Sequence, residues 1–412
     1  MNNMIRTAFS RDMNAEAAIR ACRHQLNMDG PGQSGPYMAA PDLLVIFAAG
    51  KQQPEAVLAA VKLVFGDVPL AGGAAAGVIS QNGNGYSGFE IGIIAFKGEA
   101  VTPQVLSTRG LLGGAAEASQ ALGQAVRART ENGAVVLLLF DSVAQAIPLR
   151  LHPASEIVAG FHEGLGDREL QLLGGGLLSD INLSGAWVFD EGEVCKHALT
   201  ALVFPPGVHA STEILHGCRP VSTFMEVTRI EGAEVFELDG RPALTVIEQM
   251  LGLELGTTSG QQLSLVATLG QKQGDPFAPY NENNYVNRMI LQATPDRGSV
   301  TLFDSDFARG TRVQIMSRDN LLMMESVERG VAAMRDRIAG KTCLLGLYID
   351  CAGRASVMSG AETEEAELVL RGLAPEYPFM GFYSGVEIAP FAGNYSRPLD
   401  WTGVLTILHR RE

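Results

Sequence analysis

Short apolar segments recur along the chain in a fixed order, each followed by a helical pattern, a second apolar segment and a glycine-rich turn. A short, wholly apolar run bounded by turn residues indicates a strand that is buried on both faces. In the first copy the strand covers residues 42–47, and a helix with proline in its first turn covers 54–65. A second strand at 68–71 enters the glycines of 72–77, and a strand at 89–96 closes the copy.

The same order occurs twice more. The second copy has a strand at 134–140 ending at Asp141, a helix at 153–163, a strand at 169–173 that enters glycines 174–176, and strands near 185–189 and 198–204. The third copy has a strand at 342–349 ending at Asp350 and Cys351, a helix around 362–373, a strand at 378–383 that enters Ser384 and Gly385, and a strand near 403–408. Three such copies predict a mixed α/β fold of repeated strand–helix–strand–strand modules with mixed sheets and antiparallel edges.

The residues between the second and third copies follow a different pattern, which predicts a β-rich insertion. Residues 224–240 alternate apolar and polar positions around a glycine, which is typical of a hairpin, and a helix follows at 241–250. A long helix is expected at 319–338, with Gly340 at its end. Further strands are expected at 263–268, 286–293, 299–303 and 312–316.

The chain opens with a short amphipathic helix that Asp12 can cap, followed by a loop at residues 29–36 rich in glycine and proline. We therefore divide the chain into a helix and linker at 1–41, a domain with two repeats at 42–222, and a domain with the β-rich segment, the long helix and the third repeat at 223–412.

Composition narrows the function. The chain has a formal net charge of −14 and no cluster of lysine and arginine, so a duplex nucleic acid or an anionic membrane surface is not an expected partner. The five cysteines follow no regular spacing, and no apolar run approaches the roughly 20 residues of a spanning helix. We expect a cytoplasmic protein without a disulfide framework, a metal site or a cofactor.

The segments resemble the FIST family over most of the chain from residue 42 onward. The resemblance rests on the order of several short stretches. These are the glycine turn 72–77, Ser87-Gly88, Gly174-Gly175-Gly176 leading to Ser179-Asp180, the stretch 237–243, Cys351-Ala-Gly-Arg354, and the stretch 381–390. The resemblance implies a FIST-N domain at 42–222, a FIST-C domain at 223–412, and a sensory role in intracellular signal transduction.

The same resemblance implies a small polar ligand, such as an amino acid, that is bound and not transformed. Because the chain ends shortly after its last repeat strand, we expect the signal to pass in trans to another protein. Two positions depart from the family pattern: Val386 stands where a glycine is usual, and Asp400-Trp401-Thr402 stands where the family tends to carry an asparagine. These departures imply a different ligand preference if the positions line the site.

Candidate ligand-binding residues lie at the strand ends. Arg354 is suited to clamp a carboxylate with two parallel hydrogen bonds; the alternative is a structural ion pair with Asp350 or Glu387. Glu387 and Asp180 are suited to bind an amino group; the alternative for each is a solvated turn carboxylate. The other candidates are Cys351, Gly385, Gly73 and Gly175.

Other chemistries find less support. The glycines at 72–77 match neither the dinucleotide-binding nor the Walker spacing. His152, His162, His197, His209 and His216 are scattered and are interpreted as surface or capping residues; the best metal-binding group is the weak set His209, His216 and Cys218.

An enzyme remains the main alternative, a thiol-dependent transferase or hydrolase that uses Cys351 and a base within reach of its sulfur. A third possibility is an interaction scaffold, which would expose a large apolar patch.

Overall fold

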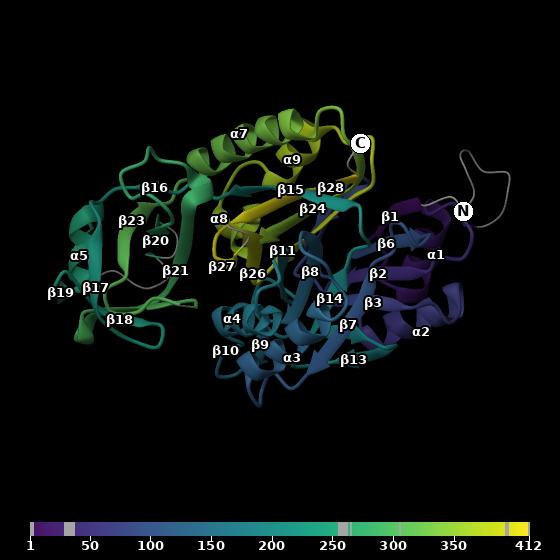
Figure 1. Cartoon of the computed structure of the whole chain (residues 1–412), viewed down its shortest axis with the longest axis horizontal. Coiled ribbons are helices and arrows are strands. Elements are labelled where there is room, and N and C mark those ends of the chain that lie inside the picture. The colour runs from purple at the N-terminus through teal and green to yellow at the C-terminus, as the bar shows by residue number, and fades with distance from the viewer. Residues whose placement is uncertain are drawn as a thin grey trace.

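The computed structural model describes residues 4–28, 38–253, 263, 266–304, 306–391 and 395–410 (Figure 1). The fold is mixed α/β, with several mixed sheets and one antiparallel β-rich sheet, as the sequence predicts. The expected loop at 29–36 lies outside the described residues.

Three units build the main body. The first unit contains β1 (Met4–Ser10), α1 (Ala15–Gln25), β2 (Leu43–Ala48), α2 (Pro54–Phe65), β3 (Leu70–Ala74), the short strands β4 (Val78–Ser80) and β5 (Gly83–Gly85), and β6 (Ile91–Lys97). The second unit contains β7 (Gln104–Arg109), α3 (Ala115–Arg127), β8 (Ala134–Asp141), β9 (Val143–Gln145), β10 (Arg150–Leu151), α4 (Ala154–Leu165), β11 (Leu170–Leu177), β12 (Val188–Asp190), β13 (Glu193–Cys195) and β14 (Ala198–Val203).

The third unit repeats this order around a long insertion. It contains β15 (Val208–Leu215), α7 (Asn320–Ile338), β24 (Thr342–Cys351), η3 (Ala352–Arg354), α8 (Ser356–Ser359), α9 (Glu365–Leu373), β25 (Phe379–Ser384), β26 (Val386–Pro390), β27 (Ser396–Leu399) and β28 (Gly403–Arg410). In every unit the central strand pairs in parallel with the strand after its helix and antiparallel with the last strand of the unit.

The units exchange hairpins in a cycle. The three sheets have the orders β1-β6-β2-β3-β12-β13, β7-β14-β8-β11-β26-β27 and β15-β28-β24-β25-β4-β5. Each sheet thus ends in a hairpin that another unit supplies: the second unit completes the first sheet, the third completes the second, and the first completes the third. This interlocking joins residues from both ends of the chain into one body.

One glycine in each unit permits a close approach of two parallel strands. An added Cβ at Gly72, Gly174 or Gly381 would lie 2.1, 1.9 or 2.1 Å from a backbone oxygen of the central strand. Because a backbone oxygen cannot move aside as a side chain does, these positions require glycine. Gly72 and Gly174 belong to the glycine-rich turns of the sequence pattern, whereas Gly381 lies within the strand expected at 378–383.

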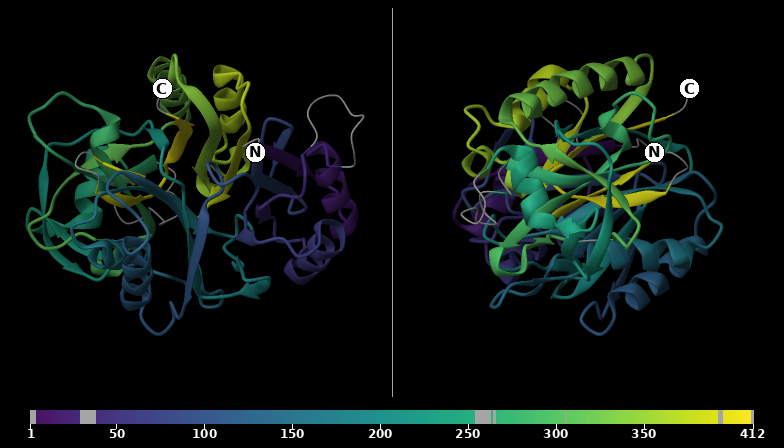
Figure 2. Two further views of the ribbon diagram at one scale, coloured as in Figure 1. Left: turned by 45° about the vertical axis from the view of Figure 1, so that its right-hand side comes forward. Right: turned by 90° about the vertical axis from the view of Figure 1, so that its left-hand side faces the viewer.

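Helix pairs cover the three sheets: α1 packs on α2, α3 on α4, and α7 on α9. Figure 1 shows α1 and α2 on the right, α3 and α4 below, and α7 and α9 above, and Figure 2 shows the same body from two further sides. Phe47 of the first unit stacks on Phe382 of the third, with ring centroids 4.4 Å apart, inside a large shared apolar core. The sheets therefore face one another and the helices lie outside.

The insertion, residues 219–317, has its own apolar core and lies to one side of the body (Figure 1). Its elements are β16 (Arg219–Pro220), β17 (Met225–Glu231), β18 (Glu234–Leu238), β19 (Arg241–Pro242), α5 (Ala243–Leu251), β20 (Ala267–Lys272), η1 (Glu282–Asn284), β21 (Tyr285–Thr294), η2 (Pro295–Arg297), β22 (Ser299–Leu302) and β23 (Arg312–Ser317). The antiparallel sheet closes into a ring because β20 pairs with β23.

Several elements differ from the sequence expectation. Asn14, not Asp12, caps α1, because its side chain accepts the amide of Ala17. The strands β1, β7 and β15 and helix α3 were not expected, and β15, which precedes the expected domain boundary at 222, pairs with β28 at the other end of the chain. Within the described residues, we find no helix with the length and apolar character needed to cross a membrane.

Candidate functional site

The central strands β8 and β24 end at polar residues, Asp141 and Cys351. In open α/β sheets the carboxyl ends of parallel strands commonly present ligand-binding groups. The two strand ends have different surroundings, and the sequence candidates gather mainly at the end of β24.

Arg354 is fully buried in an ion-pair network. Its Nε lies 3.2 Å from Oδ1 of Asp350, and its Nη2 donates to Oε1 of Glu365, which also accepts the hydroxyl of Tyr348. All four side chains are buried. This arrangement matches the structural ion pair with Asp350 that is the alternative to a carboxylate clamp, and it engages the guanidinium inside the protein. A ligand-binding role of Arg354 stays a prediction.

Glu387 and Gly175 are brought together, since they are register partners in the pairing of β26 with β11. Glu387 is buried; its carboxyl accepts the hydroxyl of Ser384 at 2.6 Å and the amide of Thr402 at 3.3 Å. Burial raises the pKa of Glu387 well above its usual range. The side chain is therefore not the solvated turn carboxylate of the alternative interpretation.

Cys351 is also buried, and burial raises the pKa of its thiol well above the ordinary value, with the charge of Glu387 acting in the same direction. A thiolate nucleophile requires the opposite shift. The surroundings of Cys351 are thus those of a packed, protonated thiol.

Asp180 and Gly73 lie elsewhere in the fold. The carboxylate of Asp180 is half-buried and accepts the amides of Asn182 and Ser184 at 2.8 and 3.2 Å, as in a polar turn. An added Cβ at Gly73 would lie 2.2 Å from the carbonyl oxygen of Trp187, beside the hairpin that the second unit supplies. Gly73 is therefore explained by strand packing.

A cavity of about 260 Å³ opens at the end of β8, between the second unit and the insertion. We call it the strand-end cavity. Of the sequence candidates its lining includes Gly385, and it also includes Val386, one of the two departures from the family pattern. The full lining is Phe140, Ser142, Leu149, Leu151, His152, Pro153, Ala154, Ala233, Leu291, Thr301, Leu302, Phe303, Asp304, Gly385 and Val386.

Ser142 is the most informative polar residue of this lining. Its Oγ is buried and has no hydrogen-bond partner among the residues that the structure describes. An added Cβ would lie 2.0 Å from this oxygen at Gly176 and 3.0 Å from it at Gly385. The two glycines thus leave room for a hydroxyl, and a buried hydroxyl without a partner is costly unless a ligand or water satisfies it.

Asp304 supplies the charge in the lining. It comes from the insertion, and its carboxylate accepts the amide of Ser155 at 2.7 Å and the hydroxyl of the same residue at 2.9 Å. Ser155 lies in the first turn of α4, where a carboxylate satisfies an amide that has no partner within the helix. Asp304 therefore ties the insertion to the second unit at the edge of the cavity.

His152, another polar residue of the lining, belongs to a cluster with Asp141 and His197. Nε2 of His152 lies 3.0 Å from Nδ1 of His197, which lies 3.9 Å from Oδ2 of Asp141. Asp141 is held in place by the amides of Val143 and His197, each 2.8 Å away. Burial lowers the pKa of His152 to about 4, with His197 contributing, so this imidazole is neutral near pH 7.

Sequence reasoning missed these groups. The expectation that the histidines are scattered was wrong for His152 and His197: His152, directly after β10, is buried, and its ring contacts that of His197, directly before β14. Asp141 at a strand end was a usable signal. No sequence pattern marks Ser142 or Asp304, since their importance depends on the packing of the insertion against the second unit.

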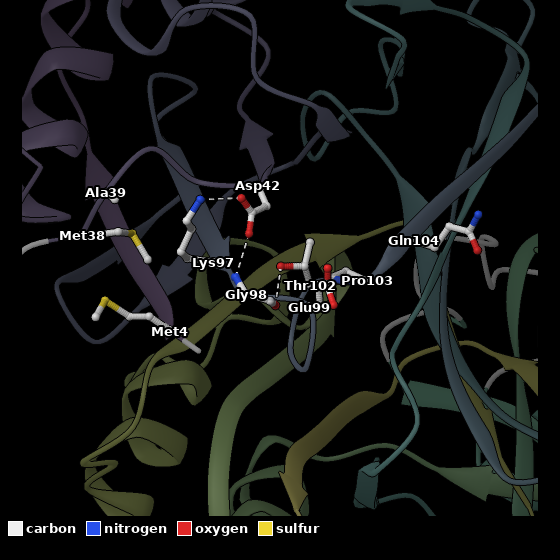
Figure 3. Close-up of a pocket in the computed structure, with 10 residues that line it drawn as sticks. All are labelled: Met4, Met38, Ala39, Asp42, Lys97, Gly98, Glu99, Thr102, Pro103 and Gln104. Carbon is white, nitrogen blue, oxygen red and sulfur yellow. Dashed lines mark hydrogen bonds and ion pairs between the residues drawn. The ribbon is translucent and has the colours of Figure 1, made fainter. Parts of the chain in front are cut away.

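A second cavity of about 630 Å³ lies between the first and second units (Figure 3). Two of its three charged side chains are already paired with each other: Nζ of Lys97 lies 2.6 Å from Oδ1 of Asp42, whose other oxygen accepts the amide of Gly98 at 2.7 Å. Figure 3 shows these contacts on one side of the lining, with Met4 and Met38 nearby. The strand-end cavity is the better candidate because it holds a buried polar atom, Oγ of Ser142, that has no partner in the described part of the chain.

Comparison with known families matches residues 42–241 to the FIST N domain and residues 243–390 to the FIST C domain. An uncharacterized protein of Mycobacterium tuberculosis (strain CDC 1551 / Oshkosh) is 28% identical over 193 residues, which is 46% of this chain and 48% of the relative. An uncharacterized protein of Mycobacterium bovis is 29% identical over 196 residues, with the same shares. The chain thus spans about half the length of the curated relatives it matches.

Proposed function

Since the chain belongs to the FIST family, with the N and C domains in one polypeptide, we propose that it is a sensory protein that binds a small ligand in the strand-end cavity. FIST domains suggest small-ligand sensing in signalling. The observation that carries the choice of site is the buried, unpartnered hydroxyl of Ser142 in an otherwise largely apolar lining.

The lining favours a small molecule with an apolar body and an amino group. The volume of the strand-end cavity, about 260 Å³, lies just below the roughly 300–1,000 Å³ of sites for drug-sized ligands. A metabolite of amino-acid size therefore fits the cavity better than a drug-sized molecule does. Asp304 is positioned to attract a positive group, and Ser142 offers a hydroxyl to a polar atom. Apolar contact comes from Phe140, Leu151, Leu302 and Phe303.

Binding would bias how the insertion sits on the body. The cavity is formed by residues of both the insertion and the body, and polar contacts connect the two. Besides Asp304, Asp306 of the insertion binds Arg397 of β27, and Arg288 of β21 donates to the carbonyl of Pro398 at 2.8 Å. A ligand that contacts both the insertion and the body has a higher affinity for the arrangement in which the two are in contact, and therefore stabilises that arrangement. A partner protein acting in trans would recognise this arrangement.

The alternative of a thiol enzyme has less support. It requires a reactive Cys351, whereas burial raises the pKa of this thiol and Glu387 adds to the rise. An amino-acid-like ligand that is bound without being transformed accounts better for the surroundings of the strand-end cavity.

A thermal-shift screen of amino acids, small amines and organic acids tests the proposal. A bound ligand at 100 times its Kd stabilises the fold by about 2.7 kcal/mol, which raises Tm by several degrees. Thr301→Trp places a large ring in the lining, and Arg312→Trp places one on an exposed part of the insertion as a control. We expect an amine-bearing compound to stabilise the natural protein and the control but not Thr301→Trp. Equal stabilisation of all three proteins, or of none, would refute the proposed site.

A further inference from the structure

We propose that Asp141, His152 and His197 form a binding site for a divalent transition metal of the Zn²⁺ type, at the wall of the strand-end cavity. The side-chain atoms that can bind a metal in these three residues all lie within 4.8 Å of one another. The site does not rest on the proposed sensory function, because metal binding is measured directly.

The spacing of the three donor atoms suits such an ion. With bonds of about 2.0–2.1 Å and tetrahedral angles, two donors on one zinc ion lie about 3.3 Å apart. The two imidazole nitrogens are 3.0 Å apart, and the carboxylate oxygen is 3.9 Å from the nearer one. The third separation, between His152 and Asp141, is at most 4.8 Å, so the carboxylate and this imidazole would have to move closer together to share one ion. Two imidazoles and one carboxylate are a set that Zn²⁺ and its neighbours in the first transition row accept.

The protein holds the ligands in place before any metal arrives. Backbone amides of Val143 and His197 fix both oxygens of Asp141, and each oxygen keeps a lone pair for a metal. His197 adopts a φ of +54°. Trp401, in the matching turn before β28 of the third unit, has the same φ, so the turn belongs to the repeat and the histidine is particular to this unit.

A hydrogen bond between the two histidines explains only the 3.0 Å contact between their ring nitrogens. The carboxylate of Asp141 lies near the same point, because its Oδ2 accepts the amide of His197 and is 3.9 Å from the imidazole of that residue. A metal with three protein ligands keeps one position open. Because His152 also lines the strand-end cavity, that position is accessible to water or to a donor atom of a ligand; this last step, unlike metal binding itself, rests on the proposed function.

The test uses the full chain, freed of metal by a chelator and titrated with Co²⁺ and then Zn²⁺. We expect one equivalent of Co²⁺ to bind with the visible absorption of a four- or five-coordinate ion, and Zn²⁺ to displace it. His152→Ala and His197→Asn should each weaken binding by at least about 100-fold, because loss of a ligand costs more than loss of an outer-shell partner. Asparagine tolerates the positive φ at position 197, so this variant should fold.

His209→Asn is the matched control, since His209 stacks on His409 in a second histidine pair away from the cluster. It should leave Co²⁺ binding unchanged. Absence of stoichiometric binding, or equal losses in the control and the cluster variants, would overturn the metal site. Metal binding with no ligand in the thermal-shift screen would sustain this site and refute the sensory proposal, and ligand binding without metal binding would do the reverse.

Discussion

Asp304 of the insertion accepts two hydrogen bonds from Ser155, one from its amide at 2.7 Å and one from its hydroxyl at 2.9 Å. The contact completes the first turn of α4, because the N-cap residue Pro153 makes no side-chain capping bond. The insertion and the second unit, which have separate apolar cores, thus meet at the N-terminal end of α4, at the edge of the strand-end cavity. This contact couples the stability of the body to the position of the insertion.

Asp304→Ala should lower the free energy of unfolding by about 0.5–2 kcal/mol, the usual cost of a lost helix cap, and should weaken ligand binding as well. Asp296→Ala, at an exposed carboxylate of the same insertion, should change neither quantity. Urea denaturation of the two variants checks the prediction. A stability of Asp304→Ala equal to that of the control would show that the contact does not hold the insertion.

Gly72→Ala should destabilise the first unit strongly. The added Cβ would lie 2.1 Å from the carbonyl oxygen of Ile46, and the φ of +102° disfavours any side chain. Overpacking alone typically costs 1–3 kcal/mol, and the backbone conformation adds about 1–2 kcal/mol.

Gly133→Ala isolates the backbone effect, since Gly133 has a φ of +81° and no atom of the described residues lies within 4 Å of its Cβ position. The difference in unfolding free energy between Gly72→Ala and Gly133→Ala measures the steric clash. Similar losses in the two variants would contradict the close approach of β2 and β3.

Asp400 gives the protein a pH dependence of stability. Burial raises the pKa of this carboxyl to about 7 from an ordinary value near 3.8, while the charge of Arg288 and the amide of Met289 oppose the rise. The folded protein therefore holds a proton that the unfolded chain has lost. This contribution is fully present below about pH 4 and is lost as the pH rises through about 7.

Asp400→Asn removes the ionisable group and keeps an oxygen for the amide of Met289, 2.9 Å away. Between pH 4 and pH 8, the unfolding free energy of the natural protein should fall relative to that of the variant, by an amount on the order of a few kcal/mol. Chemical denaturation at several pH values measures this difference. Parallel pH profiles would show that Asp400 is ionised throughout.

Cysteine labelling tests the packing at the end of β24. Cys22, Cys195, Cys218 and Cys351 are buried, whereas Cys343 is partly exposed. A thiol reagent should modify Cys343 first in the native protein, and Cys343→Ser should be nearly unreactive until it unfolds. Fast modification of Cys351, located by peptide mass spectrometry, would revive the thiol-enzyme alternative.

The sequence predicted the central strands of all three units because buried strands leave short apolar runs, and α2 begins and ends where its proline and apolar pattern indicate. It did not reveal that β4 would pair with β25, or β26 with β11, because hairpin exchange depends on long-range contacts that leave no local pattern. The edge strand β7 was missed because none of its positions is buried, so it leaves no apolar run in the sequence.

The site was predictable only in part. The strand ends and Gly385 were expected near a ligand, and Gly385 does line the strand-end cavity, although its role in binding stays a prediction. The pattern could not tell that Arg354 would be enclosed by Asp350 and Glu365, since burial is a property of the packed body. His152 and His197 are far apart in sequence, and their contact depends on turns that follow no motif.

Native mass spectrometry of the protein, purified under mild conditions, tests the central claim most directly. We expect the natural protein to retain a small amine-bearing metabolite in a one-to-one complex, and Thr301→Trp, which fills the strand-end cavity, to be isolated without it. A metabolite retained equally by Thr301→Trp would place the ligand elsewhere in the molecule and contradict the account.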